Sequence, residues 1–488
     1  MTSFDHATDD FFRARIDQMI DLRHPLAVLA QRLPWAKLEA ALAPVFAHKP
    51  RQPGAGGVDL FGPVPAGAAY VSNAGRPRLP LRLMISLLYL KHAFGLSDEE
   101  LVLRWSENIV WQYFSGMHYY EPRLPCDATQ LGRFRTAIGE AGVEELLAAT
   151  MQTAVEVKAI KPADLQRVIV DTTVQEKAIA HPTDSRLLEV ARCKLVAAAK
   201  DSGIQLKQTY AREGKRLHWK AGRYAHARQG RRMHRAISRQ RTIVGRLIRE
   251  IQRKIPVDLG STQLAELQQL LHRAQRIRDQ RPRDKNKLYA LHAPEVQCIS
   301  KGKARKRYEF GVKAGVVLTH KGGLIVGART FAGNPYDGHT LAEQLEQANI
   351  LMQDIGVSVK QVAADLGYRG RAVEADNPGI DLLHRGKFKS LSKAQRRALR
   401  RRPAVEPVIG HLKDDHGMRR CWLKGQTGDA IHAVLCAAGF NIRWLMRAVA
   451  RLGLRAVYLC LMLATFIAHL AEELATPSTL IAVSGAEN

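Results

Sequence analysis

Apolar residues in the first 160 positions recur at the spacing of helices. Residues 81–92 place apolar side chains three and four positions apart, which predicts a helix. Ser97 followed by Glu100 is a capping-box signal that starts a second helix soon afterwards, and a further helix is expected over residues 143–157. The first two helices are compatible with a helix-turn-helix and with an ordinary helical hairpin. We therefore expect residues 1–160 to form a helical N-terminal domain.

After this region the pattern changes to short runs rich in β-branched residues. Residues 168–170 predict a strand that ends in Asp171, and residues 359–364 predict another that ends at Asp365. Three more strands are expected over residues 308–319, 323–331 and 380–383, the first two joined by a hairpin at Lys321 and Gly322. Strands interspersed with helices predict a mixed α/β domain, which we place at residues 161–450.

Two further segments read as helices. Residues 186–305 combine apolar positions at helical spacing with many arginines and lysines, which predicts a basic helical insertion within the α/β domain. Residues 451–488 are expected to form an apolar helix and a tail. The uncharged run at residues 456–471 would span roughly 24 Å as a helix, less than the ~30 Å hydrocarbon core of a bilayer. We interpret it as a packing helix rather than a membrane anchor.

Charge is concentrated in the predicted insertion. The formal net charge of the chain is +28. Residues 1–130 hold 13 Lys and Arg against 13 Asp and Glu, whereas residues 186–310 hold 32 against 10. A charge block of this kind indicates a surface that meets a polyanion, and nucleic acid is the commonest one. Within it, four arginines are expected to contact phosphates: Arg231, Arg232, Arg235 and Arg239.

The cysteines and the N-terminus indicate the compartment. The six cysteines include no C-x-x-C pair, so a zinc ribbon is not predicted, and scattered thiols are typical of a reducing cytoplasm. The first residues are acidic and lack an apolar stretch, so no signal peptide is predicted. We expect a cytoplasmic, nucleoid-associated protein with no membrane partner.

Three acidic residues suggest a site for phosphodiester chemistry. Cleaving this bond needs an activated nucleophile and stabilised negative charge, which two Mg²⁺ ions held by carboxylates supply. If the strands before Asp171 and Asp365 are parallel neighbours, both carboxylates meet at the carboxyl edge of the sheet, and Glu406 can approach from a helix. By spacing alone, each of the three taken singly is better explained without catalysis, since an aspartate often ends a strand as a turn residue.

Several segments resemble one protein family. They are VIVDTTVQEKAIAHPTDSRLL (168–188), FAGNPYDGHTL (331–341), VAADLGYRG (362–370) and RRPAVEPVIGHLKDDHGM (401–418). In this order they are similar to bacterial insertion-sequence DDE transposases, of the group named after insertion sequences four and five. With the helical N-terminal region, the resemblance extends to about residue 447.

The resemblance implies a fold, a metal site and a reaction. The fold is ribonuclease-H-like, with the first Asp on strand one, the second after strand four and the Glu on a later helix. These positions correspond to Asp171, Asp365 and Glu406. Asp171 would bridge two Mg²⁺ (or Mn²⁺) ions, while Asp365 and Glu406 would each hold one. The ions would activate water for cleavage and then a DNA 3′-hydroxyl for strand transfer.

The family's Glu signature is Tyr, two residues, Arg, three residues, Glu, six residues, Lys. Arg402, Glu406 and Lys413 match this spacing, whereas Leu399 occupies the Tyr position. On a helix, positions four and seven apart share a face, so Arg402 and Lys413 are expected to contact the DNA backbone. Pro407 is best tolerated in a first helical turn, so the helix is expected to begin near Glu406.

The sequence therefore predicts a cut-and-paste transposase that binds double-stranded DNA at its terminal inverted repeats, joins it to target DNA and acts as a homodimer. Two alternatives stay open: a nuclease of the same fold without strand transfer, and a DNA-binding protein without catalysis. Other polar residues are interpreted more simply. Asp337 is interpreted as part of a turn, His411 and His416 as surface or phosphate-contacting groups, and Trp219 as a packing or base-stacking residue.

Overall fold

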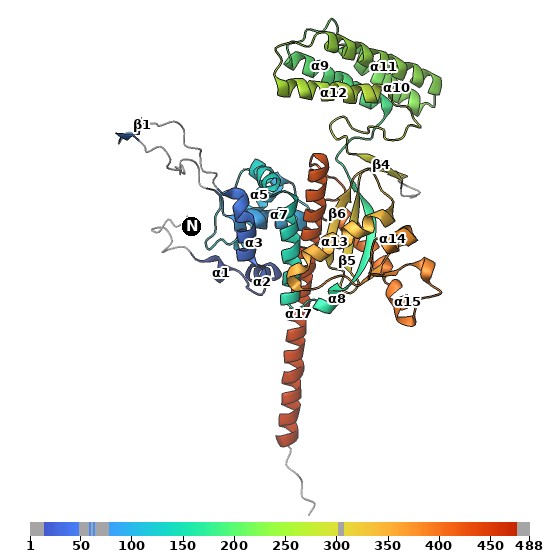
Figure 1. The fold of residues 1–488 in the computed structure, drawn as a ribbon. Helices are drawn as coiled ribbons and strands as arrows, with labels where there is room; N and C mark the ends of the chain where they lie inside the picture. The colour runs from blue at the N-terminus through green and yellow to red at the C-terminus, as the bar shows by residue number, and fades with distance from the viewer. Residues whose placement is uncertain (1–13, 48–57, 60–61, 64–77, 301–306, 476–488) are drawn as a thin grey trace, which may run out of the picture. The chain divides into compact units, whose positions relative to one another are not determined.

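A computed structural model describes residues 14–47, 58–59, 62–63, 78–300 and 307–475 (Figure 1). The chain divides into two compact units. The first combines Met1–Ile138, Glu145–Asp164 and Ala438–Asn488, and the second combines Gly139–Glu144 with Leu165–Ala437. The main segment of the second unit begins at Leu165, near the boundary expected at residue 160, whereas residues 438–450, which we expected in the α/β domain, are part of the first unit.

The N-terminal part of the chain is helical in its described residues, apart from one short strand pair. Its helices are α1 (Ile16–Met19), α2 (Pro25–Arg32), α3 (Trp35–Leu42), the 3-10 turn η2 (Ala43–Phe46), α4 (Leu81–Phe94), α5 (Asp98–Glu107), α6 (Ile109–Phe114), α7 (Ala128–Glu156) and α8 (Pro162–Leu165). Strands β1 (Val58–Asp59) and β2 (Gly62–Pro63) pair with each other.

The helices predicted in this region are present. The helix expected over residues 81–92 is α4, most of which is buried. Ser97 caps α5, because its hydroxyl accepts a hydrogen bond from the backbone N–H of Glu100 at 3.0 Å. The helix expected over residues 143–157 is the second part of α7, which is longer than predicted and contains a non-helical residue at Gly139.

The second unit contains one mixed sheet. Its strands are β3 (Arg167–Glu176), β4 (Gln297–Ser300), β5 (Tyr308–Thr319), β6 (Ile325–Phe331), β7 (Gln361–Ala363) and β8 (Asp381–Leu383). The order is β4-β5-β3-β7-β8, and β6 also pairs with β5. Strand β5 is antiparallel to β3, β4 and β6, whereas β7 and β8 run parallel to β3. The predicted mixed α/β architecture is confirmed.

Two details of the sheet differ from the prediction. Strand β3 does not end at Asp171, because the β-branched residues after it continue the antiparallel pairing with β5 as far as Glu176 opposite Gly311. Strand β4 lies inside the segment expected to be helical up to residue 305. Its four residues are too few to show a strand period in the sequence.

Short helices and turns connect the strands of this unit. They are η3 (Asp337–Thr340), α13 (Leu341–Leu351), η4 (Gln353–Ile355), η5 (Leu366–Tyr368), α14 (Arg371–Ala375), η6 (Arg385–Lys387), α15 (Lys393–Leu399), η7 (Arg402–Ala404) and α16 (Val405–Asp414). Helix α13 is fastened to the sheet by Gln347, whose amide oxygen accepts from Ala328 N–H at 3.0 Å and whose amide nitrogen donates to Ala328 O at 3.2 Å.

The basic insertion forms its own helical bundle between β3 and β4 in the chain. Its helices are α9 (Asp184–Asp201), α10 (Ala211–His226), α11 (Gly230–Arg253) and α12 (Ser261–Asp279), which lie alongside one another (Figure 1). Leu195, Leu247 and Leu271 belong to a hydrophobic core shared by these helices. The insertion therefore folds around apolar residues of its own, and most of its cations are exposed.

The last helix is longer than expected. Helix α17 runs without interruption over Gly425–Ala475, so the apolar helix predicted from residue 451 is its C-terminal part. Its portion Gly425–Gly453 is long and apolar enough to cross a membrane, but 72% of the most apolar stretch is buried inside the protein, as in a core helix. The side chains of residues 456–471 and the tail beyond residue 475 lie outside the described part of the chain.

Candidate active site

Asp171 and Asp365 occupy matching positions on two adjacent strands. The parallel pairing of β3 with β7 ends where Ile169 lies opposite Ala363. Each aspartate follows two residues later, so both side chains leave the same face of the sheet at the carboxyl edge of the parallel pair. Asp171 lies within β3, and Asp365 lies two residues beyond the end of β7.

Glu406 reaches this edge from the first turn of α16. The helix begins at Val405, one residue from the predicted start, and Pro407 lies in its first turn, where a missing backbone N–H costs nothing. Arg402 lies in the preceding 3-10 turn η7, as expected for a helix that begins near Glu406. The four-residue spacing still brings the two side chains together, with Arg402 Nη1 at 3.5 Å from Glu406 Oε1.

Arg402 connects all three carboxylates. Its Nη2 lies 2.9 Å from Asp171 Oδ2 and 3.5 Å from Asp365 Oδ2. Together with the contact to Glu406, one guanidinium touches three acidic side chains that are far apart in the chain. The structure therefore brings Asp171, Asp365 and Glu406 into one cluster.

The cluster has the character of a site for a hard cation. Three carboxylates converge with a single guanidinium among them, which leaves a formal charge of −2 if all three are ionised. The side chain of Asp171 is 17% exposed, whereas those of Asp365 and Glu406 are 53% and 67% exposed. Carboxylate oxygens that are open to solvent on one side fit Mg²⁺ or Mn²⁺, which bind few protein ligands and keep several waters.

Asp337, in the turn η3, is bound to the two strands β3 and β5 beside Asp171. Its Oδ1 accepts hydrogen bonds from Thr172 Oγ1 at 2.8 Å and from Lys313 Nζ at 2.9 Å. Thr172 directly follows Asp171, so this hydrogen bond fixes the strand beside the first carboxylate. The interpretation of Asp337 as a turn residue was incomplete, and Lys313 was missed because a lysine inside a strand gives no signal in the sequence.

Tyr368 anchors the segment that carries Asp365. It is fully buried, and its hydroxyl lies 3.5 Å from Gln344 Nε2 on α13. Burial raises the pKa of its phenol far above the ordinary value, so the group is a neutral packing residue and not a base. The turn η5 after Asp365 is thus held against the core by an aromatic ring.

Lys413 lies elsewhere than the prediction placed it. It is buried, and its Nζ lies 3.3 Å from Glu309 Oε2 on β5. Because α16 packs against the sheet, the turn that carries Lys413 faces the interior and not DNA. Leu399, at the family's Tyr position, is likewise buried, in a small apolar cluster with Leu383 and Leu391.

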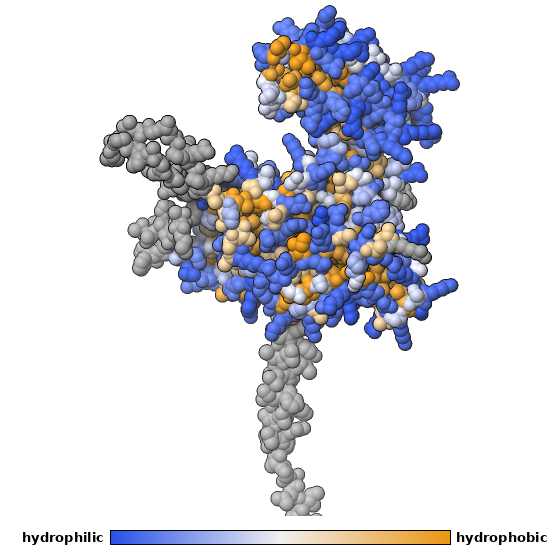
Figure 2. All heavy atoms as spheres, viewed as in Figure 1, coloured by the Kyte–Doolittle hydropathy of each residue, from blue (hydrophilic) through white to orange (hydrophobic). Residues whose placement is uncertain are grey.

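The four arginines predicted to bind DNA differ in their surroundings. Arg231, Arg232 and Arg235 are exposed on α11, whereas Arg239 is paired with Glu213 on α10, with Nε 2.7 Å from Oε1. The face of the insertion seen in Figure 2 is mainly hydrophilic. Nearby, Trp219 is 61% exposed, with the Arg223 guanidinium stacked over its ring at 4.7 Å, so it is not a core residue.

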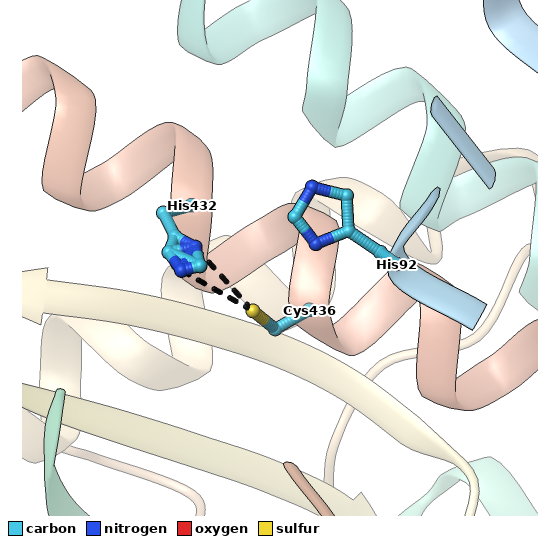
Figure 3. A group of neighbouring side chains, drawn as sticks. All are labelled: His92, His432 and Cys436. Carbon is cyan, nitrogen blue, oxygen red and sulfur yellow. Dashed lines mark hydrogen bonds between the residues drawn. The ribbon is translucent and has the colours of Figure 1, made fainter. Parts of the chain in front are cut away.

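Histidines outside the cluster have local partners. His411 lies 2.7 Å from Asp415 at the surface, whereas His416 is buried, so the expected surface position of His416 is wrong. On α17, His432 and Cys436 are buried one turn apart, with Sγ 3.5 Å from Nδ1 (Figure 3). Side chains four residues apart on a helix normally meet in this way, and we assign the pair no role.

Comparisons with known proteins add to this geometry. Residues 64–137 match a family described as a transposase domain (DUF772), and residues 377–446 match a transposase DDE domain. A protein of Rhizobium meliloti, named uncharacterized protein ORF8 in the nfe locus, is 44% identical over 218 residues, which are 45% of this chain and 93% of that protein. No solved structure matches the chain.

The matched DDE segment contains Arg402 and Glu406, whereas Asp171 and Asp365 precede it in the chain. The match to the first transposase domain thus includes no residue of the carboxylate cluster, and the match to the DDE domain includes one of its three carboxylates. The chain belongs to the same family as the Rhizobium meliloti protein and is an insertion-sequence transposase of the DDE class.

Proposed function

We propose that the chain cleaves the ends of its own insertion sequence and joins them to target DNA, using two divalent metal ions held by Asp171, Asp365 and Glu406. The observation that carries this proposal is the meeting of these three carboxylates around Arg402. We also assign the chain to the group named after insertion sequences four and five, on the motifs described above.

The order of the strands supports a ribonuclease-H-like fold. When the short β4 is set aside, the sheet reads β6-β5-β3-β7-β8, with three antiparallel strands followed by two parallel ones. In chain order β3 is then the first strand and β7 the fourth. Asp171 lies on the first and Asp365 follows the fourth, which is the arrangement that the family resemblance implies.

The residues of the cluster have distinct parts in the proposed reaction. Asp171, the least exposed of the three, would hold the ions against the sheet, and Asp365 and Glu406 would hold them toward solvent, where a DNA strand can approach. Divalent ions held by these carboxylates would supply activation of water or of a DNA 3′-hydroxyl and would stabilise the charge on the leaving oxygen. No protein nucleophile is required.

The proposed partners are the terminal inverted repeats of the element, target DNA and a second copy of the chain. Arg231, Arg232 and Arg235 are the proposed phosphate contacts on the insertion, because they are exposed, whereas the charge of Arg239 is already paired with Glu213. We propose that the protein acts in the cytoplasm on DNA of the nucleoid.

A strand-transfer assay tests this function. The purified protein is incubated with Mg²⁺, a plasmid that carries the coding region with its flanks, and a second plasmid as target. We expect donor ends joined to target DNA, and no product when EDTA removes the metal. Cut donor without joined product would indicate a nuclease, and binding without cleavage would indicate a DNA-binding protein.

A further inference from the structure

Arg402 occupies the point at which three negative charges meet. Its guanidinium contacts Asp171, Asp365 and Glu406 at 2.9, 3.5 and 3.5 Å. Without a cation among them, three ionised carboxylates so close together would repel one another. In the metal-free protein, the positive charge of Arg402 therefore reduces the repulsion between the carboxylates, as a bound metal ion would.

The same contacts occupy carboxylate oxygens that a metal ion would need as ligands. Asp171 already uses both of its oxygens, since Oδ1 accepts from the backbone N–H of Thr172 at 2.8 Å and Oδ2 accepts from Arg402. A divalent ion that binds Asp171 must replace or share the oxygen held by Arg402. Two like charges cannot occupy the same carboxylate pocket without a large electrostatic cost.

The contacts that hold the Arg402 guanidinium among the carboxylates are also weak enough for a metal ion to displace it. Two of its three contacts are at 3.5 Å, beyond the length of a good charged hydrogen bond, and they involve exposed carboxylates, which form weak pairs. Its Nε is buried without a hydrogen-bond partner among the described residues, which is an unfavourable state. It lies in the short turn η7, next to Pro403, and not in the middle of a helix.

We propose that Arg402 is an internal competitor of the catalytic metal, which holds the three carboxylates together in the metal-free protein and is displaced when divalent ions bind. This inference rests on the proposed function of the same cluster. The displaced guanidinium remains beside the site as a cation for a DNA phosphate, so metal and DNA binding favour each other.

Metal binding without DNA tests the proposal. Binding of Mn²⁺ to the full-length protein is measured by calorimetry for the wild type and for Arg402→Gln, which removes the competing charge. We expect the Kd of the variant to be about tenfold lower. Arg402→Lys, which keeps a charge at this position, is expected to bind Mn²⁺ nearly as the wild type does. Arg401→Gln removes the neighbouring exposed arginine and controls for the change in net charge.

Thermal unfolding provides a second reading. The rise in Tm on adding Mn²⁺ is expected to be larger for Arg402→Gln than for the wild type, because tighter binding to the native state stabilises it more. A cooperative unfolding transition in the same experiment also shows that the variant is folded. An unchanged or weaker Mn²⁺ affinity in folded Arg402→Gln, with clear binding in the wild type, overturns the inference and leaves the proposed function standing. Absence of Mn²⁺ binding from both proteins overturns the proposed function and the inference with it.

Discussion

At the scale of single residues, the site depends on contacts between side chains that lie far apart in the chain. The three carboxylates can be predicted from motifs, because a family resemblance carries positions that spacing alone cannot fix. The contact of Arg402 with all three could not be predicted, since it depends on where η7 lies against the sheet edge. The prediction for Lys413 was wrong for a related reason: a helical repeat says which residues share a face but not which face is buried.

Asp337 gives a prediction at this scale. Asp337→Asn removes the charge opposite the buried Lys313, and we expect it to lower the free energy of unfolding by about 1–3 kcal/mol, because an unpaired buried charge is costly. Chemical denaturation measures this decrease. Glu343→Gln is the matched control, since its ion pair with Arg329 is exposed and should contribute less than about 1 kcal/mol. Equal decreases in the two variants would contradict the supporting role of Asp337.

At the scale of elements, the pattern of apolar residues predicted most strands and helices but not their full lengths. Strands β5 and β6 were predictable because two stretches with many β-branched and aromatic residues flank the turn at Lys321 and Gly322. The extension of β3 beyond Asp171 was missed because an aspartate usually ends a strand, and here the pairing with β5 outweighs that tendency. Strand β4 was missed because its four residues show no strand pattern of their own and become a strand by pairing with β5.

Gly311 gives a prediction for the sheet. It lies where β5 pairs with both β3 and β4, and a Cβ at this position would lie 1.9 Å from the carbonyl oxygen of Gln175. We expect Gly311→Ala to destabilise the protein by more than about 2 kcal/mol, because backbone must move to admit the methyl group. Gly222→Ala on α10, where a Cβ has open space, is the control and should be neutral or slightly stabilising. Similar Tm values for the two variants would show that the close strand pairing is wrong.

His384, after β8, predicts a dependence on pH. Its Nδ1 accepts a hydrogen bond from the backbone N–H of Gly386 at 3.1 Å, and burial lowers its pKa below the ordinary 6.5. A lowered pKa in the folded state means that its contribution to stability is complete above about pH 6.5 and is lost as the pH falls through the folded-state pKa.

His384→Asn keeps a side-chain acceptor for Gly386 but does not titrate in this range. The fall in unfolding free energy between pH 7.5 and pH 5 should therefore be smaller in the variant than in the wild type. Denaturation curves at the two pH values measure it. Parallel pH profiles would assign the acid sensitivity to other groups.

At the scale of the whole molecule, the sequence shows that positive charge is concentrated in one block, and in the structure most of this block is a separate helical insertion. The basic block is a helical insertion with its own apolar core. Most of its cations lie at the surface, although a few link its helices, as Arg239 of α11 does through its ion pair with Glu213 of α10. The uninterrupted course of α17 was not predicted, because the family resemblance ends at about residue 447 and the domain boundary placed at residue 450 falls inside what is one helix.

The exposed arginines give a prediction at this scale. Replacing Arg231, Arg232 and Arg235 by Gln should reduce the slope of log affinity against log salt by about one unit for each DNA phosphate that the variant no longer neutralises. Anisotropy of a labelled short DNA duplex measures the slope over several salt concentrations. Arg239→Gln is the control, because that arginine is already paired with Glu213 and should change the slope less. An unchanged slope in the triple variant would place the DNA-binding surface away from α11.

The central claim is that three separated carboxylates form one catalytic site, and cleavage by single variants tests it most directly. Asp171→Asn, Asp365→Asn and Glu406→Gln are each incubated with Mg²⁺ and the plasmid that carries the element and its flanks. Each is predicted to cleave at least about a hundredfold more slowly than the wild type while binding the same DNA within about threefold. Cleavage at a near wild-type rate by any one of the three would contradict the account.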